Sequence, residues 1–258
     1  MTLKTKLESI PRGATARGVN RAVIEYLLEH HETQAPISVL DIPCGQGDFL
    51  HTLQSFFPSA QAYGCDLTLP DKADTKAFSA VDASRTFSVF DGKQFNCIIS
   101  ISGVMEFDNT LQFFESCEKQ LTEAGTLIVT NDNLITLRDR LEYLLFGKVR
   151  QYSIFLKSGE PTWKILPIQN LCRILHDAGF KATEIRYVSM KSKDWVWLPL
   201  ALPIYALQYL YMMASRTDMT LRQKLMLYPF KSLFFRHYLI ICQKRGAAPD
   251  VLPEAKSP

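Results

Sequence analysis

The chain lacks most of the features that mark metal-binding, secreted or nucleic-acid-binding proteins. Its six cysteines include no Cys-x-x-Cys pair and its five histidines are scattered, so we expect no metal site. Several cysteines lie inside apolar runs, which indicates reduced core residues of a cytoplasmic protein. A net charge of +3 over 258 residues is too small to indicate nucleic acid as a partner.

Apolar leaders, repeats and low-complexity tracts are also missing. The first eight residues contain no long apolar run, so no signal peptide is expected. The length suits one large α/β domain with a sizeable core. We therefore predict a flexible N-terminal arm over 1–17, a single domain over 18–244, and a disordered tail over 245–258, which contains three prolines.

Two glycines mark the most informative turn of the chain. An apolar run over 38–41 ends in an aspartate, and Gly45 and Gly47 follow before an apolar helix pattern begins. This order is typical of a buried parallel strand that passes into a helix with a ligand on the turn. The third glycine of a dinucleotide-binding turn is absent, because Leu50 occupies its position, and Asp48 would repel a pyrophosphate.

The segment 39–49 resembles the first motif of class I S-adenosylmethionine-dependent methyltransferases, in which two apolar residues precede Asp-x-x-Cys-Gly-x-Gly. The resemblance implies an α/β fold of the Rossmann-like kind, with a seven-stranded, mostly parallel sheet, helices on both faces and an antiparallel last strand. It also implies S-adenosylmethionine as the cofactor. The residues that we expect at the cofactor site are Asp41, Cys44, Gly45, Gly47, Asp66, Leu67, Asp82, Ala83 and Ser102.

Acidic residues end two further predicted strands. Asp66 closes a strand predicted over 60–66, where a carboxylate can accept hydrogen bonds from both ribose hydroxyls. Asp82 and Ala83 follow at the place where the third strand of the resembled family contacts the adenine. We therefore predict that these residues form a nucleoside site beside the glycine turn.

Candidate catalytic residues follow the next two strands. Glu106 comes after a continuous apolar strand over 95–102, and Asp132 comes after a strand over 125–130. A sugar hydroxyl as methyl acceptor requires a general base, for which Glu106, Asp132 and His176 are candidates. Relatives often have a Leu-Glu-His triplet at 105–107. Here phenylalanine replaces the histidine, so its acid–base role is not carried over.

The least ordinary segment is an apolar and basic insertion over 195–235, between strands predicted over 181–188 and 237–244. Its first 19 residues are uncharged, with tryptophans at one end and tyrosines at the other, and basic residues follow. Since both strands belong to one sheet, a single membrane crossing is excluded. We expect a monotopic hairpin in one leaflet or an apolar lid over the substrate; packing against the body or a second subunit is the alternative.

These patterns together predict a methyltransferase that acts on a small or lipid-linked acceptor, with O-methylation as the expected reaction. The late insertion resembles that of bacterial methyltransferases of polysaccharide or lipid pathways, so we expect a cytoplasmic protein in peripheral contact with the inner face of the cell membrane. One alternative is an NAD(P)-dependent oxidoreductase on a similar sheet, disfavoured by Leu50 and Asp48. Another is a non-catalytic membrane-surface module that retains the fold.

Overall fold

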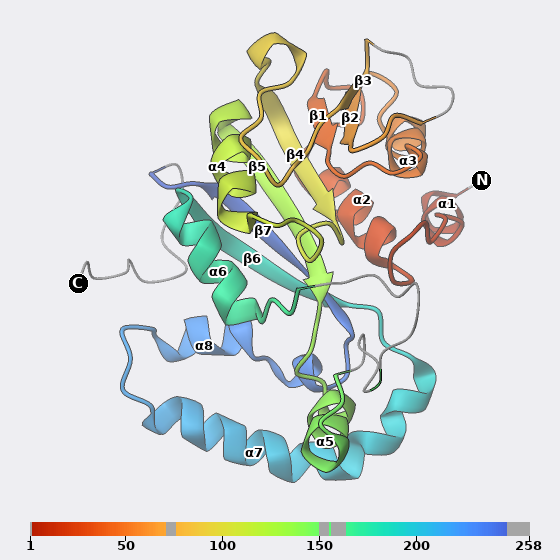
Figure 1. Cartoon of the computed structure of the whole chain (residues 1–258). Coiled ribbons are helices and arrows are strands. Elements are labelled where there is room, and N and C mark those ends of the chain that lie inside the picture. The colour runs from red at the N-terminus through yellow and green to blue at the C-terminus, as the bar shows by residue number, and fades with distance from the viewer. Residues whose placement is uncertain (1, 71–75, 150–154, 156–163, 247–258) are drawn as a thin grey trace.

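Seven strands form a single sheet in this computed structural model, which describes residues 2–70, 76–149, 155 and 164–246 (Figure 1). The strand order is β3-β2-β1-β4-β5-β7-β6, and only β7 runs antiparallel to its neighbours. The predicted fold is confirmed. The strands are β1 (Ser38–Asp41), β2 (Gln61–Asp66), β3 (Phe78–Ala80), β4 (Phe95–Ile101), β5 (Leu121–Asp132), β6 (Phe180–Val188) and β7 (His237–Lys244), with a short helix η1 (Phe90–Gly92) before β4.

Helices cover both faces of the sheet, which is why its central strands are apolar without alternation. Val39 and Ile99 belong to one buried cluster, and their neighbours Leu40 and Ile98 belong to the other, because successive side chains of a strand point to opposite faces. All six cysteines are buried and free. The covering helices are α2 (Val19–His30) and α3 (Asp48–Phe56) on the first face, and α4 (Thr110–Gln120) and α6 (Ile168–Asp177) on the second.

The connections change direction between β1 and β4. The chain runs from β1 outward through β2 and β3, and it then returns to β4 on the other side of β1. Ligands of open α/β sheets bind beside such a switch, at the carboxyl ends of the strands. The glycine turn that follows β1 and opens α3 therefore lies where this fold places a ligand.

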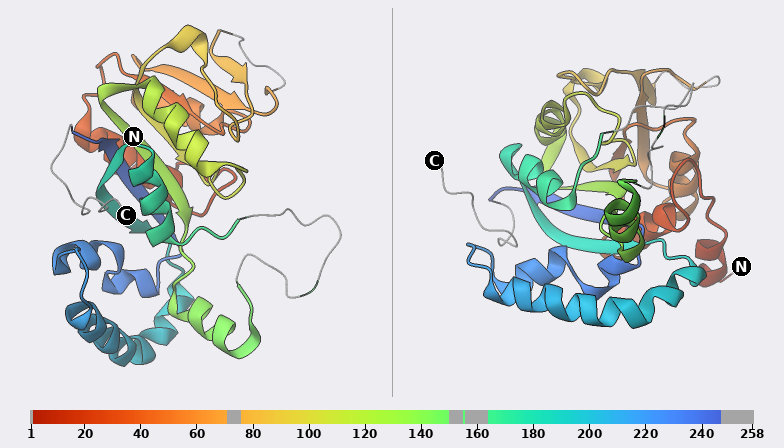
Figure 2. Two further views of the ribbon diagram at one scale, coloured as in Figure 1. Left: turned by 60° about the vertical axis from the view of Figure 1, so that its left-hand side comes forward. Right: turned by 60° about the horizontal axis from the view of Figure 1, so that its bottom comes forward.

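The insertion before β7 folds as helices on the side toward which β4 and β5 point (Figures 1 and 2). A small buried cluster, separate from those of the sheet, joins it to the helix after β5 through Leu137, Ala201, Leu233 and Phe234. The apolar helical insertion is thus confirmed. Its elements are η2 (Ser192–Trp197), α7 (Leu198–Ala214), α8 (Leu221–Leu227) and η3 (Phe230–Leu233), and the helix after β5 is α5 (Leu137–Phe146).

The helix α7 lies along one edge of the molecule (Figure 2). It continues through Pro203, which lies inside the helix. Among the described residues, one helical segment, Ser192–Ala214, has the length and apolar composition to cross a membrane, and only 11% of its apolar window is buried. Both of its ends connect to strands of the same sheet.

The structure places the described part of the N-terminal arm against the body. It forms a short helix, α1 (Leu3–Glu8), capped by the Thr2 side chain. Leu7 and Ile10 pack against the cluster that contains Val39, and Thr15 is buried. The polar composition that indicated a flexible arm hides these few apolar contacts. Of the predicted disordered tail, residues 247–258 lie outside the described part of the chain.

Candidate active site

The turn after β1 depends on glycine at two positions. Gly45 and Gly47 have φ angles of 54° and 82°, in the left-handed region that disfavours residues with a Cβ. Gly47 is the N-cap of α3, and a Cβ there would approach the Phe78 ring to 3.2 Å. A Cβ at Gly45 would meet nothing within 4 Å. The backbone at Gly45 therefore faces open space in which a ligand can approach it closely.

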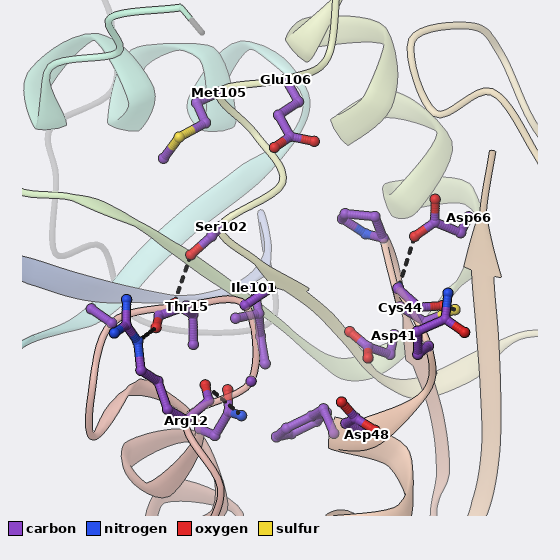
Figure 3. A pocket seen from close by; sticks show the side chains of 18 of the residues that line it. Arg12, Thr15, Asp41, Cys44, Asp48, Asp66, Ile101, Ser102, Met105 and Glu106 are labelled. Carbon is purple, nitrogen blue, oxygen red and sulfur yellow. Dashed lines mark hydrogen bonds between the residues drawn. The ribbon is translucent and has the colours of Figure 1, made fainter. Parts of the chain in front are cut away.

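A cavity of about 450 Å³ opens beside this turn (Figure 3). Its walls come from the N-terminal arm, the glycine turn, the segment after β4 and the ends of β5 and β7. Seven of the residues predicted for cofactor binding or catalysis line it: Asp41, Cys44, Gly45, Asp66, Ser102, Glu106 and Asp132. The topology thus brings together residues that are spread over 92 positions of the sequence.

Four predicted cofactor residues lie outside this lining. Gly47 is buried beneath the turn, and the Leu67 side chain is 70% exposed. Ala83 belongs to the core, while Asp82 pairs with Arg85 at 3.0 Å and caps the backbone N–H of Ser84. Because β3 ends at Ala80, the chain has already turned away from the strand end at these two positions.

Asp41 is a buried carboxyl group on the cavity wall. It is 2% exposed, and among the described residues its Oδ1 has no hydrogen-bond partner. Burial, together with the negative charge of Asp66, raises the pKa of Asp41 well above its usual range. A cationic ligand group beside Asp41 would pair with its unpartnered oxygen. It would also offset the negative charge of Asp41 and Asp66.

Asp66 is held in place by the backbone of the same region. Its Oδ2 accepts a hydrogen bond from the N–H of Gly45, and its Oδ1 accepts one from the N–H of Leu67, both at 2.7 Å. Each carboxylate oxygen has further acceptor capacity, and the side chain is only half-buried. The geometry therefore leaves Asp66 able to accept hydroxyl donors from a ligand in the cavity.

His237 is the functional candidate that the sequence did not reveal. It is buried at the start of β7, and its Nδ1 lies 3.0 Å from Oδ1 of Asp132 at the end of β5. A carboxylate only accepts hydrogen bonds, so the shared proton lies on Nδ1 and leaves Nε2 with a lone pair. The hydroxyls of Thr130 and Ser102 lie 3.3 Å and 3.4 Å from Nε2. Asp132 and His237 thus form a hydrogen-bonded carboxylate–imidazole pair on the cavity wall. Histidine is the candidate general base, and Asp132 orients its imidazole.

Ser102 connects this pair to the opposite wall. Its hydroxyl lies 2.8 Å from that of Thr15 in the arm (Figure 3), and its N–H donates to Thr130 Oγ1 at 2.9 Å. Ser102 also has a φ of 57°, a left-handed conformation that costs energy for a residue with a Cβ and concentrates at functional sites. The arm and the polar ends of β4 and β5 are therefore linked through one serine.

Two charged side chains flank the cavity. Glu106 is exposed, and Figure 3 shows it with Met105 on the side away from Asp48. Arg12 brings a guanidinium from the arm to the wall, where its Nε donates to the carbonyl of Thr15. The cavity therefore offers a cation at one part of its wall and carboxylates at others. His176, the remaining candidate base, lies on α6, outside the lining, and its carbonyl accepts a hydrogen bond from Arg245.

Comparison with known proteins gives a family and a fold. Residues 13–185 match a family described as a methyltransferase domain. No curated protein matches the chain in sequence. An S-adenosylmethionine-dependent methyltransferase from Clostridium acetobutylicum superimposes with a TM-score of 0.52 at 12% identity, covering 94% of this chain and 97% of that one.

Two further solved structures share the fold. A cyclopropane synthase from Mycobacterium tuberculosis has a TM-score of 0.53 at 16% identity, covering 86% of this chain and 83% of that one. A geranyl diphosphate C-methyltransferase from Streptomyces coelicolor has a TM-score of 0.50 at 14% identity, covering 88% and 79%. At these identities the likeness is one of fold.

Proposed function

Since this chain belongs to the methyltransferase domain family, we propose that it transfers the methyl group of S-adenosylmethionine to a hydroxyl of a lipid-linked acceptor at a membrane surface. The single observation that carries the proposal is the Asp132–His237 pair in the cavity that the glycine turn also lines. Methylation of an alcohol differs from methylation of a thiolate or a carboxylate because the acceptor must lose a proton that it holds tightly at neutral pH. The buried imidazole is suited to accept that proton.

The residues present fit S-adenosylmethionine, which is the cofactor of this family and supplies a methyl group bonded to a positively charged sulfur. Asp41, with its unpartnered oxygen, suits the ammonium or the sulfonium. Arg12 suits the carboxylate, and Asp66 suits the ribose hydroxyls. Leu50 lies on the buried face of α3, so the third glycine of a dinucleotide-binding turn has no counterpart here.

The pair acts on the acceptor in one step. Nε2 of His237 would accept the proton that the acceptor hydroxyl loses, and the Asp132 carboxylate would stabilise the resulting imidazolium. Ser102 and Thr15 hold the arm across the cavity, which limits the access of water to the reacting groups. Glu106 and Asp132 were the predicted catalytic candidates; of these, Asp132 has the contacts of a residue that orients a base.

The surface of α5 and α7 supports a membrane-bound acceptor. We define the apolar platform as the exposed side chains Tyr143, Leu144, Leu145 and Phe146 of α5, and Leu200, Leu202, Leu207, Leu210, Tyr211 and Met213 of α7. Their exposed fractions range from 41% to 77%. So many large exposed apolar side chains on two helices are what a protein or membrane contact requires. Exposed basic side chains follow α7 in the sequence, at Arg216, Arg222 and Lys231, as expected for contact with an anionic lipid surface.

The test is transfer of a labelled methyl group from S-adenosylmethionine into a membrane-lipid extract. We expect saturable incorporation by the native protein and a fall in kcat of about a hundredfold or more in His237→Gln, the usual contribution of a general base. The matched control is His51→Gln, which removes an exposed imidazole outside the cavity and should leave the rate unchanged. Full activity of His237→Gln, with normal S-adenosylmethionine affinity, would refute the assignment of the base.

A further inference from the structure

A second cavity, of about 530 Å³, lies next to the first. The two share Arg12, Ala16 and Asp132 as lining residues, so they are contiguous along the N-terminal arm and the end of β5. The remaining walls of the second cavity are Arg17, the segment Ser189–Ser192 after β6, and Arg236 before β7. Ser192 begins η2, which leads directly into α7. The second cavity therefore adjoins the proposed base at Asp132 and includes the start of the segment that leads into α7.

Positive charge predominates in this second cavity. Among the described residues, four cationic side chains line it, Arg12, Arg17, Lys191 and Arg236, against one lining carboxylate, that of Asp132, while Arg236 is also paired with the Asp194 carboxylate. They come from three segments that are far apart in the sequence, which the fold brings to one place. Asp132 also accepts a hydrogen bond from Nδ1 of His237.

Arg236 is fixed in place by a buried partner. Its Nε donates to Oδ2 of Asp194 at 2.9 Å, and its Nη2 donates to Oδ1, so the guanidinium and the carboxylate form a bidentate pair. The side chains of Arg236 and Asp194 are only 11% and 7% exposed. Arg17 and Lys191 take no part in that pair, and the positive charge of Arg236 is the main reason that the pKa of Lys191 is lowered. An anion placed among these groups would relieve their mutual repulsion.

We propose that the cavity lined by Arg17, Lys191 and Arg236, here called the cationic cavity, binds a phosphate group of the methyl acceptor. Planar guanidinium groups match the geometry of phosphate oxygens, and a lysine adds a third point of charge. The inference rests on the proposed function, because it assigns to the acceptor a phosphate between its apolar part and the hydroxyl that receives the methyl group. A phosphate held there fixes the distance from the membrane surface at which an acceptor hydroxyl meets His237.

Binding of two probes to protein saturated with S-adenosylhomocysteine tests this site. Isothermal titration at low ionic strength would measure the affinity of inorganic phosphate and of dihexanoyl phosphatidic acid below its micelle concentration. We expect saturable binding of both, weakened about tenfold in Lys191→Gln and in Arg17→Gln, the effect of losing one charge-assisted hydrogen bond. Lys193→Gln is the matched control. Lys193 carries the same charge and lies two residues after Lys191 in the sequence, but its side chain does not line the cavity.

The outcomes are distinct. Tighter binding of the phosphatidic acid identifies a lipid as the source of the phosphate, while equal affinities identify a soluble phosphorylated acceptor, and either result supports the phosphate site. Binding that does not saturate, or that Lys193→Gln weakens as much as Lys191→Gln, would overturn it. Unchanged S-adenosylhomocysteine affinity shows that each variant is folded. The binding experiment does not measure methyl transfer, so the phosphate site would stand even if the proposed reaction failed. Protein that transfers methyl groups but binds neither probe would refute the phosphate site and leave the proposed reaction intact.

Discussion

Asp41 is the side chain whose ionisation should respond most to the cofactor. Burial and the charge of Asp66 raise its pKa in the free protein, so a proton is retained on it above the pH at which an ordinary carboxyl group ionises. A cationic ligand group nearby favours the ionised form and lowers that pKa. Between the two pKa values the complex therefore holds fewer protons than the free protein, and binding must release a proton.

We accordingly expect the affinity for S-adenosylmethionine to increase as the pH rises through the pKa of Asp41 in the free protein. Titration calorimetry in two buffers of different ionisation enthalpy measures the proton released. Asp41→Asn should abolish that release, whereas Asp48→Asn, which changes an exposed carboxylate on the same cavity, should retain it. Proton uptake, or release that survives Asp41→Asn, would contradict this account of Asp41.

At the level of residues, the sequence predicted Asp132 as a candidate but did not predict its partner His237. Asp132 follows an apolar strand and is recognisable as a strand-end acid. His237 begins a strand 105 residues later, and only the antiparallel register of β5 and β7 places the two opposite one another. A strand's residue pattern states that it is buried but not which strand it pairs with. For the same reason the sequence suggested Asp82 as a strand-end residue of the site, although it lies away from the cavity.

Among the elements, the glycine turn was the best predicted. Its two left-handed glycines and the apolar face of α3 are local features that the sequence displays directly. The N-terminal arm was the least well predicted, because its place over the cavity depends on single contacts such as those of Thr15 and Ile10 with distant strands and helices. Long-range contacts of isolated residues leave no periodic signal.

The helices α5 and α7 carry the prediction for membrane contact. We expect the protein to float with vesicles of phosphatidylcholine and phosphatidylglycerol, and to do so more weakly with phosphatidylcholine alone. Leu207→Glu, on α7, should weaken vesicle binding about tenfold or more, because it removes the burial of a leucine side chain. Leu3→Glu makes the same change at a leucine of α1 that is 57% exposed, and it should have no effect.

Two results would contradict membrane contact. One is the absence of vesicle binding by the native protein. The other is a dimer in analytical ultracentrifugation that Leu207→Glu converts to a monomer without any change in vesicle binding, which would make the apolar platform an interface between two copies of the chain. The sequence indicated the uncharged part of α7 but not Tyr143–Phe146 of α5, whose exposure follows from the way α5 is placed at the edge of the molecule.

At the scale of the whole molecule, the fold determines where the cofactor binds but not which atom receives the methyl group. The solved structures that share it include a C-methyltransferase and a cyclopropane synthase. The acceptor is decided by groups at the rim of the sheet and by what reaches them. We propose that here these are the Asp132–His237 pair, the cationic cavity contiguous with it, and the apolar platform. Their alignment was not predictable from the sequence, because each is assembled from segments on different strands and helices.

The proposed acceptor is a hydroxyl of an amphiphilic, lipid-linked molecule. The most direct measurement is to isolate the product after transfer of an isotopically labelled methyl group and to locate the label by nuclear magnetic resonance. We predict a methyl ether in a product that partitions into organic solvent, formed by the native protein and lost in His237→Gln. A label on carbon or nitrogen, or a product that stays wholly in the aqueous phase, would contradict it.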